Sequence, residues 1–378
     1  MISTGYGTTQ ASTYTALYRD AFRRYEAVNR GVRFLVNACC ALDYDIKDQL
    51  IDPITPGIRQ KTVHRLLNHR PNPYQSIQAF RQNIFTDFVL EGNAFIYWDG
   101  AFLYHLPAAN IHIYTDEKTY VKSYKYNGVI DFTPDEIIHL QDLSSVSIFR
   151  GNPRLESTHL TLDLLSKMVS FQSNFFENGA IPGIVLETDN TLSSAAKERT
   201  VQTWKAKYSV RNGARTPLII DNGLKLKSLN DVSFKELDFE TSVKAAEESI
   251  LTALGVPPIL INGGNNANIS PNLRLFYLET VMPIIRIYVA GFERFFGYDV
   301  EAITANVSAL QPDIKELASY YTTLVNGGIM TPAEAREALR LVPLGDAEME
   351  KIRVPANIAG SAVDPSKGGA PKKDSQSP

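Results

Sequence analysis

Cysteine is nearly absent from this chain of 378 residues, and the two that are present, Cys39 and Cys40, are adjacent. Neighbouring side chains in a helical pattern point in different directions and cannot easily bridge. We therefore expect two reduced, core-facing thiols rather than a redox or metal site. Residues 1–10 are polar and lack the apolar segment of a signal peptide. No apolar run approaches the ~18 residues of a transmembrane helix, so we expect no membrane span.

Motifs that carry catalysis or metal binding are also missing. The six histidines form no HExxH, HxH or Cys/His cluster; they are His64, His69, His105, His112, His139 and His159. The chain has neither a GxxxxGK[ST] phosphate loop nor the GxSxG turn of a hydrolase, and its acidic residues are scattered rather than paired. We expect a protein that performs no chemistry and needs neither a metal nor a cofactor.

Neither sign of charge is in excess. The formal net charge is -3, from 38 basic and 41 acidic residues, which argues against a strongly basic nucleic-acid-binding protein. A hydrophobic content of 44% over this length is ample for a buried core and suggests more than one domain.

The first part of the chain mixes helical and strand patterns. Apolar residues recur at helical spacing within residues 20–40 and 74–90. The period then changes to two, and short strands are expected at 94–98, 102–106, 111–114, 121–126 and 137–140. Asp99-Gly100 and Asn127-Gly128 are typical of hairpin turns. An α+β block therefore extends to about residue 155.

A small unit between two helices follows. Residues 156–178 form a helical run with one apolar stripe, made of Leu160, Leu164, Met168, Phe171 and Phe175. Residues 182–231 predict a compact unit with a strand at 184–187, a helix capped by Thr191 or Ser193, and strands at 218–220 and 224–228. Residues 236–254 are helical again.

The segment 251–283 is the most informative part of the chain. A strand-like piece at 259–261 follows two prolines, and the loop at 262–268 carries no charge. Ser270 and Pro271 predict the start of a long helix that runs towards residue 296, because serine caps the first free N–H groups and proline suits the first turn. Pro283 should kink that helix, since proline removes one backbone hydrogen bond.

The C-terminal part reads as a strand-like patch at 300–307 followed by helices at 313–326 and 332–341. Thr331 and Glu334 have the spacing of a capping box. Residues 356–378 are rich in Gly, Ser, Pro and Lys and are expected to be disordered.

Five stretches, in order, carry a resemblance to a known family. They are Asn72-Pro73 before a helical run leading into LEGNAF at 90–95; FTPDEIIHL at 132–140, followed by GNP at 151–153; FFENGAIPG at 175–183; the segment 251–283; and LVNGGIMTPAEAR at 324–336. Together they span roughly residues 30–345. In these stretches the chain resembles the portal proteins of tailed bacteriophages, specifically the HK97-type portal family.

This resemblance implies an α+β portal-like fold. Its parts would be a flexible N-terminus (1–19), an α+β wing (20–155), a stem helix (156–180), a small α/β clip (181–231) and a second stem helix (232–258). A tunnel loop (259–270), a long kinked helix with a return to the wing (271–311), crown helices (312–355) and a disordered tail (356–378) would follow.

The resemblance also implies the functional residues. The DNA-channel loop would be Asn262, Gly263, Gly264, Asn265, Asn266, Asn268 and Ser270, whose asparagines we expect to present neutral hydrogen-bonding groups to passing phosphates. A channel-facing acidic helix would carry Glu240, Glu247 and Glu248, because like charge avoids tight binding of DNA. The clip docking surface would carry Lys197, Lys205, Lys207, Arg211 and Arg215, and Pro283 would mark the helix kink.

A portal would form a ring, expected to be a dodecamer, at one vertex of the virion capsid, and would be assembled in the host cytoplasm. Its implied partners are double-stranded DNA, the major capsid protein, the terminase, the head-completion or tail connector protein, and a scaffold, with no membrane. An alternative is a non-channel phage adaptor or minor capsid protein, which would form a low-order oligomer. A third reading, a phage hydrolase with scattered acidic residues, would require a divalent metal.

Overall fold

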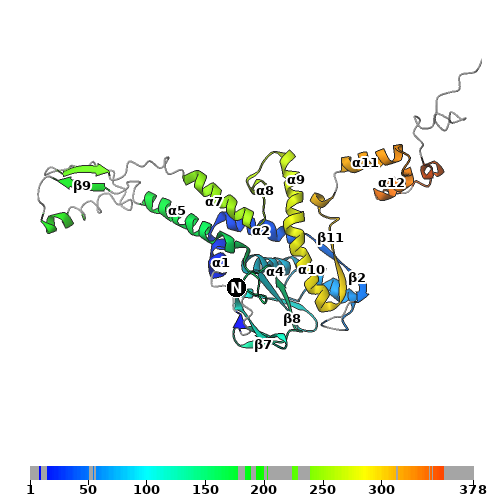
Figure 1. Ribbon diagram of the computed structural model, residues 1–378, viewed down its shortest axis with the longest axis horizontal. Coiled ribbons are helices and arrows are strands. Elements are labelled where there is room, and N and C mark those ends of the chain that lie inside the picture. The colour runs from blue at the N-terminus through cyan, green and yellow to red at the C-terminus, as the bar shows by residue number, and fades with distance from the viewer. Residues whose placement is uncertain are drawn as a thin grey trace, which may run out of the picture. The chain divides into compact units, whose positions relative to one another are not determined.

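The computed structural model describes residues 8–9, 15–50, 54, 57–177, 184–188, 193–199, 202, 224–228, 239–311, 314–339, 341–342 and 344–352. The chain divides into two compact units, Met1–Asn306 and Val307–Pro378. Helices and strands alternate along the chain (Figure 1), which confirms the predicted mixed α and β class.

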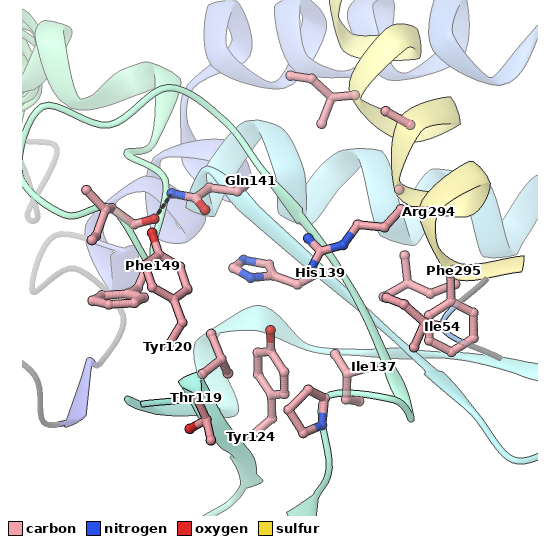
Figure 2. Close-up of a pocket in the computed structure, with 17 residues that line it drawn as sticks. Ile54, Thr119, Tyr120, Tyr124, Ile137, His139, Gln141, Phe149, Arg294 and Phe295 are labelled. Atoms are coloured by element: carbon pink, nitrogen blue, oxygen red, sulfur yellow. Dashed lines mark hydrogen bonds between the residues drawn. The ribbon is translucent and has the colours of Figure 1, made fainter. Parts of the chain in front are cut away.

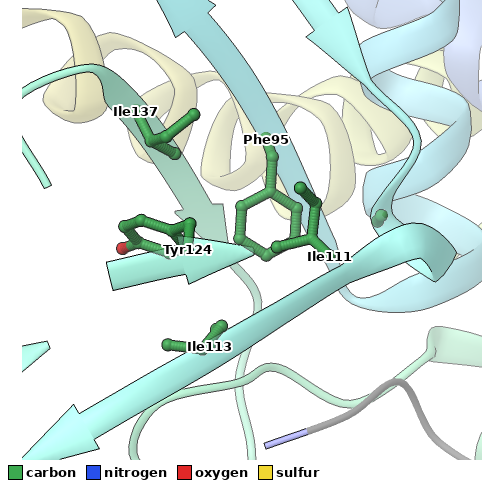
Figure 3. Close-up of a cluster of buried hydrophobic side chains, with 6 residues drawn as sticks. Phe95, Ile111, Ile113, Tyr124 and Ile137 are labelled. Carbon is green, nitrogen blue, oxygen red and sulfur yellow. The ribbon is translucent and has the colours of Figure 1, made fainter. Parts of the chain in front are cut away.

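Two small antiparallel sheets form the centre of the first unit. The first has the order β4-β3-β8, from β3 (Asn93–Trp98), β4 (Leu103–Leu106) and β8 (Ile137–Gln141). The second has the order β1-β5-β6-β7, from β1 (Thr8–Thr9), β5 (Ile111–Asp116), β6 (Tyr120–Tyr126) and β7 (Ile130–Phe132). A buried cluster joins them, in which Phe95 and Ile137 meet Ile111, Ile113 and Tyr124 (Figure 3). Alternating burial along β5 shows that one face of this strand supplies the core.

The strands and turns of this region follow the sequence closely. Each of the predicted strands between residues 94 and 140 is present, and only the three-residue strand β7 was missed. Asn127 and Gly128 have φ of 51° and 69°, as a two-residue hairpin turn with two left-handed positions requires. Strand β3 pairs antiparallel with β4, and β6 pairs antiparallel with β7, so a hairpin is present at each predicted turn.

Helix α10 (Met282–Phe296) covers the other face of the first sheet. A Cβ on Gly291 would lie 2.4 Å from Leu140 Cδ2, so glycine is what lets α10 approach β8 this closely. Helix α4 (Ile77–Glu91) packs against β3 and α2 (Glu26–Cys40). The hydroxyl of Ser76 caps α4 by accepting a hydrogen bond from the Ala79 N–H at 3.2 Å.

Part of the N-terminal segment has regular structure, although flexibility is predicted for residues 1–19. Helix α1 begins at Thr15 and runs to Arg24, and Thr8–Thr9 pair with β5. The reason is tertiary: Arg19 donates to Asp87 Oδ1 at 2.6 Å and to Glu91 Oε1 at 2.5 Å. Both carboxylates belong to α4 and are buried, so α1 is tied to the core.

The strand pair β2 (Asp43–Leu50) and β11 (Tyr298–Ile303) brings the two ends of the first unit together. Helix α3 (Gln60–Asn68), which is not among the predicted helices, lies beside β2. The amide of Asn68 bonds the Tyr44 N–H at 2.9 Å and the Tyr44 carbonyl at 2.7 Å, as a neighbouring strand would.

The predicted long helix is present, with an irregular turn inside it. Helix α9 (Asn266–Phe276) continues through a π-helical turn, η4 (Tyr277–Val281), into α10. Pro283 is the second residue after that turn, and the turn itself interrupts the α-helical hydrogen-bond ladder. A kink caused by Pro283 stays a prediction.

Ile269–Phe296 is long and apolar enough to cross a membrane by length and composition alone, with 39% of its apolar window buried. Charged residues interrupt this helix, so no continuous apolar run is visible in the sequence. Tyr288 and Phe292 on its inner face are buried, and packing against the core accounts for much of its apolar content.

Two further predicted strands are present, β9 (Ile184–Thr188) and β10 (Leu224–Ser228), and they pair antiparallel. The expected strand at 218–220 lies outside the described residues. The second unit contains α11 (Ile314–Asn326) and α12 (Pro332–Ala338). Thr331 and Glu334 form the predicted capping box. The expected tail, 356–378, lies outside the described residues.

Candidate functional site

Two of the sequence motifs meet at one backbone junction. Gly92 has φ of 68° at the end of α4, and a Cβ there would lie 2.3 Å from the Asn152 carbonyl oxygen. Asn93 Nδ2 donates to the Gly151 carbonyl at 3.0 Å, and the Gly151 N–H donates to Asn93 Oδ1 at 2.9 Å. His139 Nε2 reaches the same Asn93 oxygen at 3.0 Å. The motif residues at 90–95, 139 and 151–153 therefore hold the fold together rather than forming a surface site.

The candidate channel segment starts at a tight joint. Helix α7 (Phe239–Ala253) ends just before Gly255, which has φ of 73°. A Cβ on Gly255 would lie 2.5 Å from Thr280 Oγ1, and that hydroxyl donates to the Gly255 carbonyl at 2.8 Å. Thr280 belongs to the π-helical turn η4, so this contact joins α7 to the long helix α9–η4–α10.

The strand predicted at 259–261 is wrong, because these residues belong to a short helix, α8 (Pro258–Asn262). Pro258 occupies the first helical turn, where its missing N–H costs nothing, and no strand in the described part of the chain pairs with this segment. Arg30 on α2 donates to the Ile261 carbonyl at 2.9 Å. The C-terminal end of α8 is thereby held by α2.

The uncharged loop is shorter than predicted. Only Gly263, Gly264 and Asn265 lie between α8 and α9, because the Ile269 N–H already bonds the Asn265 carbonyl at 3.2 Å. Ser270 and Pro271 consequently lie inside α9, and the predicted helix start at Ser270 is wrong. Asn266 and Asn268 fall in the first turn of that helix.

The exposed part of this segment carries no charge. Asn262, Gly263, Gly264 and Asn265 are exposed, and Gly263 has φ of 83° with nothing within 4 Å of a Cβ placed there. Glycine is needed at that position for its left-handed backbone rather than for space. The arrangement is a neutral tip on two helices whose other ends are packed into the core.

Helix α7 presents its carboxylates outward. Glu240 and Glu248 are exposed and Glu247 is half-buried, while Ala246, Ile250 and Leu251 face the core. Glu240 pairs with Lys244 one turn later at 2.8 Å, an exposed pair that contributes little to stability. The outer face of α7 is therefore acidic.

Helix α5 (His159–Glu177) packs beside α7, but most of its predicted apolar stripe does not face the core of the subunit. Leu162 and Leu165 are buried, whereas Leu160 is 78% and Leu164 is 52% exposed. A partly covered apolar row of this kind is typical of a surface that contacts another protein.

The predicted clip docking surface falls largely outside the described residues. Lys197 lies in the helical stretch 194–199, and Ser193 Oγ accepts from the Ala196 N–H at 3.3 Å, which selects Ser193 over Thr191 as the cap. Lys205, Lys207, Arg211 and Arg215 lie outside the described part of the chain.

The described residues offer little for catalysis. They contain no group of three His, Cys, Asp or Glu side chains that could hold a metal ion. Burial raises the pKa of both thiols, that of Cys40 to about 12, so neither is a thiolate at neutral pH. Burial, aided by the charges of Arg150 and Arg294, lowers the pKa of His139 to about 3 and keeps its imidazole neutral.

Comparison with known proteins gives a consistent result. The family model described as "Phage portal protein" matches residues 26–339. The portal protein of Escherichia phage T5 is 40% identical over 361 residues, covering 93% of this chain and 90% of that protein. The portal protein of Enterobacteria phage HK97 is 23% identical in an alignment that covers 89% of this chain and 83% of that protein.

Solved structures share the fold. A chain from the neck of the native GTA particle, computed with C12 symmetry, superposes with a TM-score of 0.65 at 20% identity and covers 90% of this chain and 97% of that chain. An HK97-family phage portal protein from Corynebacterium diphtheriae gives a TM-score of 0.59 at 15% identity, covering 80% of this chain and 99% of that chain. Since the family model and the T5 relative both extend over most of the sequence, this chain belongs to the phage portal protein family.

Proposed function

We propose that the protein is a portal: a ring of about twelve copies at one vertex of the virion capsid, enclosing a channel through which double-stranded DNA is packaged and ejected. The observation that carries the proposal is the 40% identity to the T5 portal protein over 93% of this chain. The role is structural, because such a ring works by geometry and needs no chemical step. The terminase, a scaffold, the major capsid protein and the tail connector are its proposed partners, and the host cytoplasm is the proposed place of assembly.

A ring of identical subunits needs a heterologous contact, in which one face of a subunit meets a different face of the next. The exposed leucines of α5, Leu160 and Leu164, are well suited to such a contact, because closing it would remove apolar surface from water. We assign α5 and α7 to the stem, residues 181–231 to the clip, 20–155 to the wing and 312–355 to the crown.

The neutral tip and the acidic face of α7 are the proposed channel surface. Asn262 and Asn265 would offer amide groups to passing phosphates without a fixed positive charge. Glu240, Glu247 and Glu248 would repel the duplex, so that no counterions are released and DNA is not held. The basic residues around Lys197 in the clip would dock the motor and later the connector.

Native mass measured by light scattering, followed by electron microscopy of the same peak, tests the ring. Twelve chains of 42.1 kDa give about 505 kDa. A particle near that mass with a central hole is the expected result. A stable dimer without a hole, at every salt concentration tried and with scaffold present, would favour the non-channel adaptor.

The channel surface has its own test. Deleting residues 263–265 should leave ring formation intact and impair DNA packaging or retention. Replacing Glu247 and Glu248 by lysine should slow DNA passage and make the rate depend on salt, because each ring then gains phosphate-binding groups. Normal packaging by both variants would remove the basis for the channel assignment.

A further inference from the structure

A cleft of about 410 Å³ lies between β6, β8 and α10, and none of its lining residues belongs to the proposed channel surface (Figure 2). Its walls come from β6, β8 and α10, which contribute Tyr124, His139 and Arg294 respectively. Its volume is within the usual range for sites that accept a small ligand or a few side chains. This β8 cleft has no part in the proposed channel function.

One edge of β8 borders this cleft. In the sheet order β4-β3-β8, β8 is the last strand, and no strand in the described part of the chain pairs with its outer edge. The Trp98 N–H bonds the Glu136 carbonyl at 2.9 Å, and the Asp142 N–H bonds the Gly92 carbonyl at 2.9 Å. These two bonds fix which residues of β8 face β3.

Antiparallel pairs alternate between bonded and non-bonded positions. Ile138 and Leu140 therefore turn their backbone groups towards β3, while Ile137, His139 and Gln141 turn theirs away from it. These outward groups form a short edge of donors and acceptors, and an edge of this kind is a template for another strand.

The surroundings of the edge are apolar and exposed. At the mouth of the cleft, Ile54 is 36%, Tyr120 is 51% and Ile148 is 40% exposed. The ring of Tyr120 lies 4.6 Å from that of Phe149, so these side chains form a surface rather than isolated contacts. Exposed apolar side chains grouped around a hollow are typical of protein interaction sites.

Arg294 is the charged side chain among the described residues that line the cleft. None of those described residues is a carboxylate. Arg294 is exposed and forms no ion pair with the other described residues. Its charge and that of Arg150 also reach His139, whose pKa is lowered by burial first and by these two arginines second. A bound segment that brings a carboxylate would find a partner in Arg294.

We propose that the β8 cleft binds an extended segment of another protein, which adds as a strand to the outer edge of β8. The segment alternates apolar and acidic residues: one apolar side chain enters the cleft between Tyr124 and α10, and one carboxylate pairs with Arg294. This mode combines main-chain hydrogen bonds for affinity with side-chain pockets for specificity. It does not depend on the channel role.

The probe is a displayed library of random ten-residue peptides, selected on the purified monomeric full-length chain. Enriched peptides should alternate apolar and acidic residues and should protect the amides of Ile137 and His139 from hydrogen exchange. Arg294→Glu should weaken the binding of these peptides about tenfold or more, since an ion pair is lost and a repulsion is gained. Arg286→Glu, at another exposed arginine of α10, is the matched control and should leave binding unchanged.

Two results would overturn the proposal. One is a selection that enriches no peptide, or only peptides that Arg294→Glu leaves unaffected. The other is full protection of the Ile137 and His139 amides in the assembled ring alone, which would make the cleft a contact between copies of this chain. Ring mass is measured on the same samples, so failure of the peptide site is distinguished from failure of the portal assignment.

Discussion

The contact between Gly255 and Thr280 should be the most sensitive point of the proposed channel support. In Gly255→Ala the new Cβ would lie 2.5 Å from Thr280 Oγ1 and 2.7 Å from Cγ2, and the backbone φ of 73° is unfavourable for alanine. The left-handed backbone costs about 1 kcal/mol. Displacing Thr280 costs about 1 kcal/mol in its lost hydrogen bond and about 1 kcal/mol in overpacking. The free energy of unfolding should therefore fall by about 3 kcal/mol.

Urea unfolding of the monomeric chain, followed by the fluorescence of Trp98 in a Trp204→Phe background, measures this change. Trp98 is buried, with its ring 5.4 Å from that of Phe296 at the end of α10, so it reports on the core to which the joint is attached. The double variant Gly255→Ala with Thr280→Ala removes both close contacts with the threonine side-chain ends. The double variant should lose less free energy of unfolding than the sum of the losses in the two single variants.

Gly128→Ala, in the hairpin turn between β6 and β7, is the matched control. Its φ of 69° is close to the 73° of Gly255, but nothing lies within 4 Å of the new Cβ, so only the backbone cost of about 1 kcal/mol applies. If the two alanine variants lose equal stability, the tight joint between α7 and η4 does not exist in solution, and the argument for a rigid channel support fails.

Three further outcomes are expected. The fold holds His139 neutral with a pKa of about 3 against an ordinary 6.5, so its contribution to stability is complete above pH 6.5 and is lost as pH falls towards 3. In that window the free energy of unfolding of the wild-type chain should fall by up to about 1.4 kcal/mol for each unit that pH falls, and His139→Gln should lack this slope. Urea titrations at several pH values measure both, and the same slope in the variant would contradict the role of His139. Arg150 donates to the Ala108 carbonyl at 2.7 Å and to the Ile111 carbonyl at 2.9 Å. Arg150→Met leaves both carbonyls without this donor and should lower the free energy of unfolding by about 3 kcal/mol. A loss below about 1 kcal/mol in the same urea assay would show that the two hydrogen bonds do not stabilise the fold. Leu164→Glu should leave the melting temperature of the monomer nearly unchanged and abolish the ring seen by light scattering. Ser170→Glu, on another face of α5, should leave the ring intact. Intact rings in both variants would exclude the Leu164 face of α5 from the interface.

The strand region was predictable because its signals are local. Period-two alternation and the turn pairs Asp99-Gly100 and Asn127-Gly128 specify short antiparallel strands without reference to distant residues. The capping box at Thr331 is equally local. Helix α3 was missed because its place is fixed by a long-range contact, the Asn68 amide bonded to both backbone groups of Tyr44.

The candidate site was only partly predictable. An uncharged Gly/Asn segment was correctly identified between two long helices, but its composition concealed the early start of α9 and the helical form of residues 258–262. Three residues hold this segment in place: Gly255, Thr280 and Arg30. The sequence marks only Gly255, as a glycine after an apolar run. Their roles come from contacts across 25 and 231 positions of the chain.

Motifs and local periodicity were enough to identify the family and the mixed fold class, because both signals are local. Which faces of the elements are covered depended on the tertiary structure. It left Leu160 and Leu164 of the predicted apolar stripe exposed. It buried Arg150 and left His139 only partly exposed, although polar side chains usually lie at the surface. The reason is that burial depends on the neighbours a side chain meets after folding, and distant segments supply those neighbours.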